Sequence, residues 1–318
     1  MKFPSNYNCK ENPERIVLTP WFYYDVRKCN KRTIYIPSPA LKKVQRIIMR
    51  KYFKPHWTSM SVKEAASVHC GKKWLMKLDI KDFFNSITEE QIKDILSRYV
   101  ERESDQNGNV QKDKEPYDIE QVFSMCTVEG KLPTGAPTSP YIANLLLLEF
   151  DLGINEFCRK YSVTYSRYLD DLFFSTDNPQ YILSLVELEV LNHFKAMGFS
   201  INVEKIKYIS SNKRQQILGL GVNNKQPVLT KEDKRKYRAY FYNMLYPIQF
   251  NKQKIFKEHE LEILGHLAYI KSVDEEYYVR IVFYIFNLLV RFNIQQKSCL
   301  KKLMKIFSSP APCGRGLG

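Results

Sequence analysis

The sequence predicts an α+β fold, in which an antiparallel sheet and a set of helices share one chain. Two runs rich in aromatic and apolar residues, 163–168 and 172–175, flank an acidic pair and indicate a β-hairpin. Strand-like and helical runs alternate before and after this hairpin, up to about residue 228. From Lys231 to about Phe307 the pattern is helical throughout, which predicts a separate helical domain near the carboxyl end.

Charge and composition narrow the classes of function. The chain has 318 residues, 49 of them Lys or Arg and 34 Asp or Glu, and the resulting net charge of +15 predicts a polyanionic partner. Nucleic acid is favoured over membrane, because no run approaches the roughly 18 apolar residues of a membrane span and no basic amphipathic anchor stands out. The amino-terminal residues lack the apolar core of a signal peptide, so we expect a cytoplasmic protein.

Histidine and cysteine patterns give no support to a zinc site. The seven cysteines are scattered without a CxxC pair, and the five histidines show no ligand spacing. We therefore expect the cysteines to be reduced and mostly structural. Any bound metal is expected to be held by oxygen atoms.

The first informative segment spans residues 31–53. Alternation at Thr33–Ile36 predicts a strand, and Ser38 or Pro39 then begins a helix with one apolar face and many cations elsewhere. A strand bearing Lys31 and Arg32 beside a basic helix could hold a triphosphate or a nucleic-acid backbone. A solvated helix face explains each single lysine about as well.

Residues 63–87 read as a helix that leads into a buried strand. Asp79 lies near the end of this strand, between Leu78 and Ile80. Burying a lone carboxylate is unfavourable unless it is paired or bound to metal, so Asp79 is a candidate ligand. The alternative is an aspartate at a strand end that faces solvent.

Two further segments precede the central hairpin. The charged stretch 101–115 is predicted to be an exposed loop between helices at 88–100 and 119–126. The string KLPTGAPTSPYIAN, residues 131–144, contains Gly135 and three prolines and predicts a rigid turn before an apolar helix that runs towards Tyr161. Such a turn can serve as a platform beneath a base pair, or be only a loop.

The acidic pair Asp170–Asp171 lies at the turn of the central hairpin. Adjacent carboxylates repel each other, so keeping both ionised requires a compensating cation. Carboxylate oxygens suit Mg²⁺, or Mn²⁺ in its place, and two such ions about 3.5–4 Å apart support phosphoryl transfer. Asp79 is the obvious third ligand. The alternative is a polar hairpin turn, because Asp is common in turns.

After the hairpin the pattern changes from mixed to helical. A helix is predicted over 179–197, then a strand-like run over 199–209 that contains Lys205, and another strand and turn over 216–224. We place a domain boundary near residues 228–230. Beyond it, basic residues interleaved with Tyr and Phe suit a module that grips a nucleic-acid duplex, and the tail 308–318 is expected to be mobile.

The order of these motifs resembles that of the reverse transcriptases, in particular the bacterial retron and related defence-associated enzymes. The motifs are the buried Asp79 strand, LPTGAPTSPYIAN, YLDD, GFSIN-x-x-K and LGL, and they cover about residues 31–224. The resemblance implies a right-hand polymerase with fingers, an antiparallel-sheet palm and an α-helical thumb. The implied boundaries are fingers at 1–75 and 95–130, palm at 76–94 and 131–228, and thumb at 229–318.

The resemblance also implies roles for individual residues. Asp79, Asp170 and Asp171, with the backbone carbonyl of Ile80, would bind two Mg²⁺ ions. Lys205 matches the lysine thought to protonate the departing pyrophosphate, and Phe84 the aromatic gate that excludes a ribose 2′-OH and so favours dNTPs. The incoming dNTP would contact Arg32, Lys31, Thr134 and Gly135. The expected nucleic-acid contacts are Pro137, Tyr168, Lys231, Lys234, Arg235 and Arg238.

By this resemblance the protein is an RNA-directed DNA polymerase of a retron antiphage system. It would copy part of a structured noncoding RNA into single-stranded DNA, msDNA, priming from an internal 2′-OH of that RNA and acting with an effector from the same locus. One alternative is another defence-associated reverse transcriptase that makes unbranched cDNA, because the retron strings NAxxH and VTG are incomplete here. Another is a catalytically idle RNA-binding scaffold, against which the three retained aspartates argue.

Overall fold

The computed structural model describes residues 14–29, 32–53, 60–100, 118–246 and 254–292. It divides the chain into two compact units, the first made of residues 1–60 and 74–208 and the second of 61–73 and 209–318. Lys31, the predicted loop 101–115 and the tail 308–318 lie outside the described residues.

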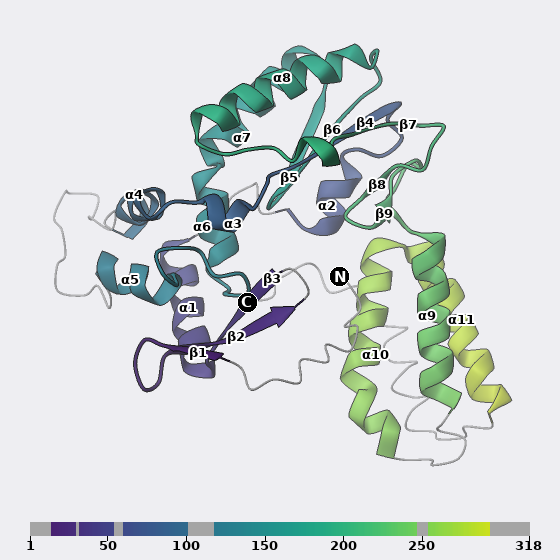
Figure 1. Cartoon of the computed structure of the whole chain (residues 1–318). Helices are drawn as coiled ribbons and strands as arrows, with labels where there is room; N and C mark the ends of the chain where they lie inside the picture. Colours follow the sequence, from purple (N-terminus) through teal and green to yellow (C-terminus); the bar gives the residue numbers. More distant parts are fainter. Residues whose placement is uncertain (1–13, 30–31, 54–59, 101–117, 247–253, 293–318) are drawn as a thin grey trace, which may run out of the picture. The chain divides into compact units, whose positions relative to one another are not determined.

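A four-stranded antiparallel sheet is the centre of the first unit (Figure 1). Its strand order is β5 (Thr164–Tyr168), β6 (Asp171–Thr176), β4 (Trp74–Asp79) and β7 (Lys207–Ser210). Helices α7 (Leu148–Lys160) and α8 (Tyr181–Ala196) pack on β5 and β6 and on each other. This arrangement confirms the predicted hairpin and the α+β class.

A second sheet of the first unit has the strand order β1 (Glu14–Val17), β2 (Tyr23–Cys29) and β3 (Arg32–Pro37). Helix α1 (Pro39–Tyr52) packs against β3 and against α5 (Ile119–Cys126). The unit is completed by α3 (Phe83–Ser86), α4 (Glu89–Val100) and α6 (Ser139–Leu146). One apolar core joins these elements, because residues of α1, α4, α5 and the main sheet belong to a single buried cluster.

The second unit combines short strands with helices. Its strands are β8 (Gln216–Ile217), β9 (Leu220–Gly221) and β10 (Val228–Leu229), and its helices are α2 (Val62–Ser67), α9 (Lys231–Leu245), α10 (Lys254–Val273) and α11 (Glu275–Arg291). The three long helices confirm the predicted helical region as far as residue 292. None of the helices in the described part of the chain is long and apolar enough to cross a bilayer.

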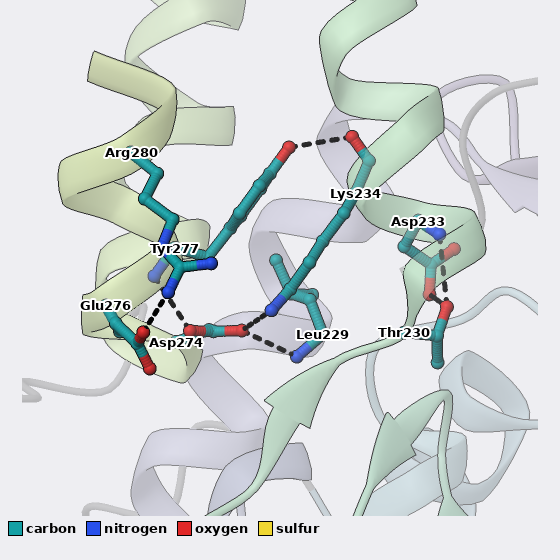
Figure 2. A network of polar contacts seen from close by, with 8 residues as sticks. All are labelled: Leu229, Thr230, Asp233, Lys234, Asp274, Glu276, Tyr277 and Arg280. Carbon is teal, nitrogen blue, oxygen red and sulfur yellow. Dashed lines mark hydrogen bonds and ion pairs between the residues drawn. The ribbon is translucent and has the colours of Figure 1, made fainter. Parts of the chain in front are cut away.

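A buried carboxylate ties α9, α11 and β10 together (Figure 2). Asp274 accepts hydrogen bonds from the backbone N–H groups of Leu229 at 3.0 Å and Tyr277 at 2.9 Å, and it forms an ion pair with Lys234 at 2.8 Å. The hydroxyl of Tyr277 donates to the carbonyl of Lys234 at 2.7 Å. Lys234 therefore has a structural partner inside the helical bundle.

Two sequence expectations differ from the structure. The apolar helix expected to run from residue 138 towards 161 is two helices, since α6 ends at Leu146 and α7 begins at Leu148. The run 199–209 was expected to be a strand, but it forms a single bridge at Ile201, a 3₁₀ turn η1 (Val203–Lys205) and then β7. The turn arises because the backbone N–H groups of Lys205 and Ile206 bond locally to Asn202 and Val203.

Candidate active site

Antiparallel pairing brings two of the predicted aspartates together. Strands β4 and β6 run in a register that sets Asp79 directly opposite Asp171. Residues paired in this way project from the same face of a sheet, with Cβ atoms about 4.5–5.5 Å apart. Asp170 precedes Asp171 in the turn, and its carbonyl accepts a hydrogen bond from the backbone N–H of Ile80 at 3.0 Å. Asp79 and the pair Asp170–Asp171, which are 91 and 92 positions apart in the sequence, thus form one acidic site.

The pKa of Asp171 reflects both burial and repulsion between the carboxylates of this site. Burial, followed by the charges of Asp170 and Asp79, raises the pKa of Asp171 to about 6, and the cations Lys77 and Lys205 only partly oppose that rise. A cross-strand pair of like charges destabilises a sheet when it stands alone. The arrangement is therefore suited to a cationic ligand.

The backbone of the acidic turn is held by a buried arginine. Leu169 has a φ of 57°, a conformation that a non-glycine residue seldom adopts. Arg167 on β5 donates to the Leu169 carbonyl at 3.1 Å and to the side chain of Asn144 at 2.8 Å. Its Nε atom also donates to Asp151 of α7 at 2.8 Å. The guanidinium thus connects the turn to helices behind the sheet.

Sequence reasoning missed Arg167 and Asp151 as part of the site. Their side chains are fully buried, with exposed fractions of 1% and 0%. Tyr165 also donates to Asp151, at 2.7 Å, and burial together with that carboxylate raises the pKa of Tyr165 well above its ordinary value. An arginine inside a strand of buried residues is the signal that could have indicated the pair.

Lys205 lies at the edge of the acidic site. The segment before it is joined to the end of β4, because the N–H of Asn202 donates to the carbonyl of Asp79 at 2.8 Å and Ile80 pairs with Ile201. The 3₁₀ turn then directs Lys205 back, so that its Nζ atom lies 2.8 Å from the Asp79 carboxylate. About half of the lysine side chain is exposed. The local turn, rather than a continuous strand, brings this amine to Asp79.

The loop that contains Thr134 and Gly135 is attached to the strand of Arg32. The N–H of Tyr35 in β3 donates to the carbonyl of Thr134 at 2.8 Å. Gly135 has a φ of 114°, and a Cβ atom there would lie only 2.6 Å from the Tyr35 carbonyl oxygen. Glycine is therefore required by both conformation and space. The structure brings together the loop and the strand that were predicted to contact the incoming nucleotide.

Phe84 lies on α3, the short helix that follows β4. A left-handed residue, Asp82 with a φ of 47°, turns the chain between them. The ring of Phe84 stacks on Phe83 with centroids 5.7 Å apart, and Phe83 packs edge-on against Phe199 at 5.8 Å. Phe84 is half-buried and keeps part of its ring exposed.

The remaining predicted residues are spread over both units. Arg32 begins β3 and Tyr168 ends β5, where it pairs with Asp171; Pro137 is half-buried after the Gly135 loop. The other four belong to α9 in the second unit, and one of them, Lys234, pairs with Asp274 as described above. These four residues are Lys231, Lys234, Arg235 and Arg238.

The donor atoms of the acidic site fit a hard divalent cation. Within the described residues no group of three or more His, Cys, Asp or Glu side chains already converges as a metal cluster. However, the donors at the site are carboxylate oxygens, and the pKa of Asp171 is raised by burial and then by the charges of Asp170 and Asp79, effects that a bound cation would oppose. Oxygen-only ligands are those that Mg²⁺ and Mn²⁺ prefer.

Comparison with known proteins identifies the relatives of this site. Residues 26–267 match the family model described as reverse transcriptase (RNA-dependent DNA polymerase). The retron Ec83 reverse transcriptase of Escherichia coli is 31% identical over 236 residues, which cover 69% of this chain and 74% of that protein. The retron Mx65 reverse transcriptase of Myxococcus xanthus is 27% identical over 285 residues, which cover 85% of this chain and 65% of that protein.

Among solved structures, apo telomerase from Candida tropicalis is similar with a TM-score of 0.48 and 14% identity, covering 94% of this chain and 68% of that one. The family match, together with the antiparallel sheets, confirms the predicted right-hand polymerase class. The matches to retron enzymes confirm the resemblance inferred from the order of the motifs.

Proposed function

Because this chain belongs to the reverse transcriptase family, as a retron-type RNA-directed DNA polymerase, we propose that it copies part of a structured noncoding RNA into single-stranded msDNA. The observation that carries the proposal is the pairing of Asp79 with Asp171 beside the Asp170 turn, with Lys205 at its edge. We place the activity in a retron antiphage system that includes an effector protein from the same locus.

The acidic site would hold the metal ions of the reaction. Asp79, Asp170, Asp171 and the backbone carbonyl of Ile80 are the proposed ligands of two Mg²⁺ ions, for which Mn²⁺ can substitute. When bound, such ions lower the pKa of the attacking primer hydroxyl and offset charge on the phosphates.

The other residues position substrates and handle a proton. Arg32 and Lys31 would bind the triphosphate, and the loop of Thr134 and Gly135, fixed to the same strand, would line the nucleotide. The ring of Phe84 would leave no room for a ribose 2′-OH. Lys205 carries a proton on Nζ, and its half-exposed side chain allows the amine to move from Asp79 to the leaving pyrophosphate.

The domain assignment is part of the proposal. We assign the fingers to residues 1–75 and 95–130, the palm to 76–94 and 131–228, and the thumb to 229–318. In this assignment Lys231, Arg235 and Arg238 of α9 would contact the duplex phosphates, and Pro137 and Tyr168 of the palm would also contact the nucleic acid. Lys234 is a weaker candidate for a phosphate contact than the sequence analysis indicated, because Asp274 already neutralises its charge.

The proposal is tested by purifying the protein from a host that carries its native locus and sequencing all bound RNA and DNA. The matched control is the double variant Asp170→Ala/Asp171→Ala. A short DNA joined to a structured RNA through a 2′,5′ branch, present with wild type and absent with the variant, supports the proposal. Unbranched cDNA that is lost in the variant would indicate another defence-associated reverse transcriptase instead of a retron enzyme. RNA without DNA in both proteins would favour the RNA-binding scaffold.

A further inference from the structure

Cations dominate the exposed face of helix α1. Leu41, Gln45, Ile48 and Tyr52 are buried and attach the helix to the core of the first unit. The exposed face carries four cations and no acidic residue, and α1 contains no Asp or Glu at all over Pro39–Tyr52. The four cations are Lys42, Lys43, Arg46 and Arg50, which we call the α1 cationic face.

The α1 cationic face differs from the surfaces of the other helices. On α4, α7, α9 and α11, at least one cation pairs with a carboxylate one turn earlier, as Lys93 does with Glu89 at 3.0 Å and Lys160 with Glu156 at 3.5 Å, whereas α1 has no carboxylate that could do so. The four residues of the α1 cationic face form no ion pair with any residue that the structure describes. Their charge is therefore available to an external anion.

This arrangement works against the stability of α1. Arg46 has a cation one turn away on each side, Lys42 and Arg50, and like charges spaced i,i+4 repel each other. The first turn also lacks the acidic residue that would complement the helix dipole. A polyanion bound along this face would relieve both effects.

An exposed tryptophan stands beside the amino end of the same helix. Trp21 lies in the turn between β1 and β2, and 75% of it is exposed. Its backbone is nevertheless fixed, because the hydroxyl of Ser38, the residue that caps α1, donates to the Trp21 carbonyl at 2.9 Å. The N–H of Ser38 also donates to the carbonyl of Tyr23 at 2.9 Å. An exposed indole on a fixed backbone offers a stacking surface for a nucleobase.

We propose that Trp21 and the α1 cationic face form an RNA-binding surface outside the polymerase site. The cations bind successive phosphates of one strand, and the indole stacks on a base at its end. From Lys42 to Arg50 the helix rises about 12 Å, which is long enough for its cations to contact more than one phosphate of a strand. The choice of RNA rests on the proposed function, in which a structured RNA is bound throughout synthesis.

RNA explains this surface better than a lipid membrane does. A helix that lies on a membrane inserts an apolar face among the acyl chains. The apolar face of α1 is buried in the protein core, and Ile47 is the one large apolar residue exposed among its cations. Phosphate contacts require only the exposed cations.

The test compares charge-matched variants. Lys43→Gln/Arg46→Gln/Arg50→Gln removes three cations from α1, and Lys93→Gln/Arg98→Gln/Lys160→Gln removes three ion-paired cations from α4 and α7. Fluorescence anisotropy with a single-stranded oligoribonucleotide of about 20 nucleotides gives the affinity at salt concentrations between about 50 and 300 mM. The substituted side chains are exposed except that of Lys93, which is half-buried, and circular dichroism checks that each variant is folded.

The α1 variant is expected to bind at least about tenfold more weakly at low salt, with a salt slope smaller by about two to three, whereas the control keeps the wild-type slope. Trp21→Ala is expected to weaken binding about 5- to 150-fold with the slope unchanged, because stacking is not ionic. Equal slopes for the two triple variants would overturn the proposal. The proposal would also be overturned if the α1 variant lost binding to phosphatidylserine vesicles while its affinity for RNA stayed at the wild-type value.

A primer-extension assay separates this proposal from the proposed function. If the wild type extends a DNA primer on RNA but the α1 variant binds RNA like the control, the surface proposal fails and the function stands. If the wild type extends no primer while the α1 variant loses RNA affinity, the proposed function fails and the surface stands.

Discussion

Replacing Arg167 by methionine should impair both the fold and the site, because this side chain serves two structures at once. Its guanidinium pairs with Asp151 inside the protein and donates to the Leu169 carbonyl of the acidic turn. Methionine fills a similar volume but can neither neutralise Asp151 nor hold the turn. The substitution leaves a carboxylate buried without its cation.

The expected destabilisation follows from this burial. Removing one partner of a buried ion pair destabilises a protein by about 3–5 kcal/mol, against about 1 kcal/mol for an ordinary hydrogen bond. At about 2–4 °C per kcal/mol for a unit of roughly this size, the melting temperature should fall by about 6–20 °C. Arg98→Met is the matched control, because it breaks an ion pair of the same kind at the surface of α4 and should change stability far less.

Urea unfolding and primer extension on an RNA template together test the two roles. The double variant Asp151→Leu/Arg167→Met should regain part of the lost stability, because the buried charge is gone, but should stay poorly active, because nothing holds the Leu169 carbonyl. Activity that recovers in parallel with stability would refute the positioning role. A wild-type unfolding free energy for Arg167→Met would refute the whole argument.

Three other predictions concern separate parts of the chain. Burial, with a smaller effect of Lys72, lowers the pKa of His69 to about 3, below the value of about 6.5 expected in the unfolded chain. As the pH falls, the His69 side chain is therefore protonated first in the unfolded chain. The free energy of unfolding should be fully present above pH 6.5 and about 2 kcal/mol lower at pH 5. Urea titrations in which His69→Asn loses as much stability at acid pH as the wild type would contradict this. Gly135→Ala should destabilise the protein by about 2–5 kcal/mol and lower dNTP incorporation, since the added methyl meets the Tyr35 carbonyl oxygen; unchanged melting and KM for dNTP would disprove the clash. Phe84→Ala should raise incorporation of rNTPs relative to dNTPs in single-nucleotide assays, and an unaltered ratio would exclude Phe84 as the gate.

Local patterns predicted the elements of the site, and long-range contacts decided the details. The hairpin at Asp170 and the buried strand of Asp79 follow from apolar periodicity, and the register of one strand pair brings their carboxylates together. The partner of Arg167 lies 16 residues away in α7, that of Lys234 lies 40 residues away at the N-cap of α11, and no local pattern identifies either partner. Both cations are used inside the fold, which net charge alone cannot reveal.

The run around Lys205 shows a second reason why pattern reasoning is incomplete. Its alternating apolar residues predict a strand, but local hydrogen bonds close a 3₁₀ turn instead. That turn is what returns the Lys205 amine to Asp79. The sequence therefore identified Lys205 as a site residue, whereas the position of its amine depends on the backbone conformation of Val203–Lys205.

The central claim is tested most directly by RNA-templated DNA synthesis with the purified protein. Incorporation of dTTP on poly(rA) primed with oligo(dT) is measured with Mg²⁺ for the wild type and for Asp171→Asn, a nearly isosteric change that removes one carboxylate charge. We expect robust incorporation by the wild type and a loss of at least about a hundredfold in the variant, because several kcal/mol of charge stabilisation disappear. Equal incorporation by the two proteins would contradict the assignment of the acidic site as the polymerase centre.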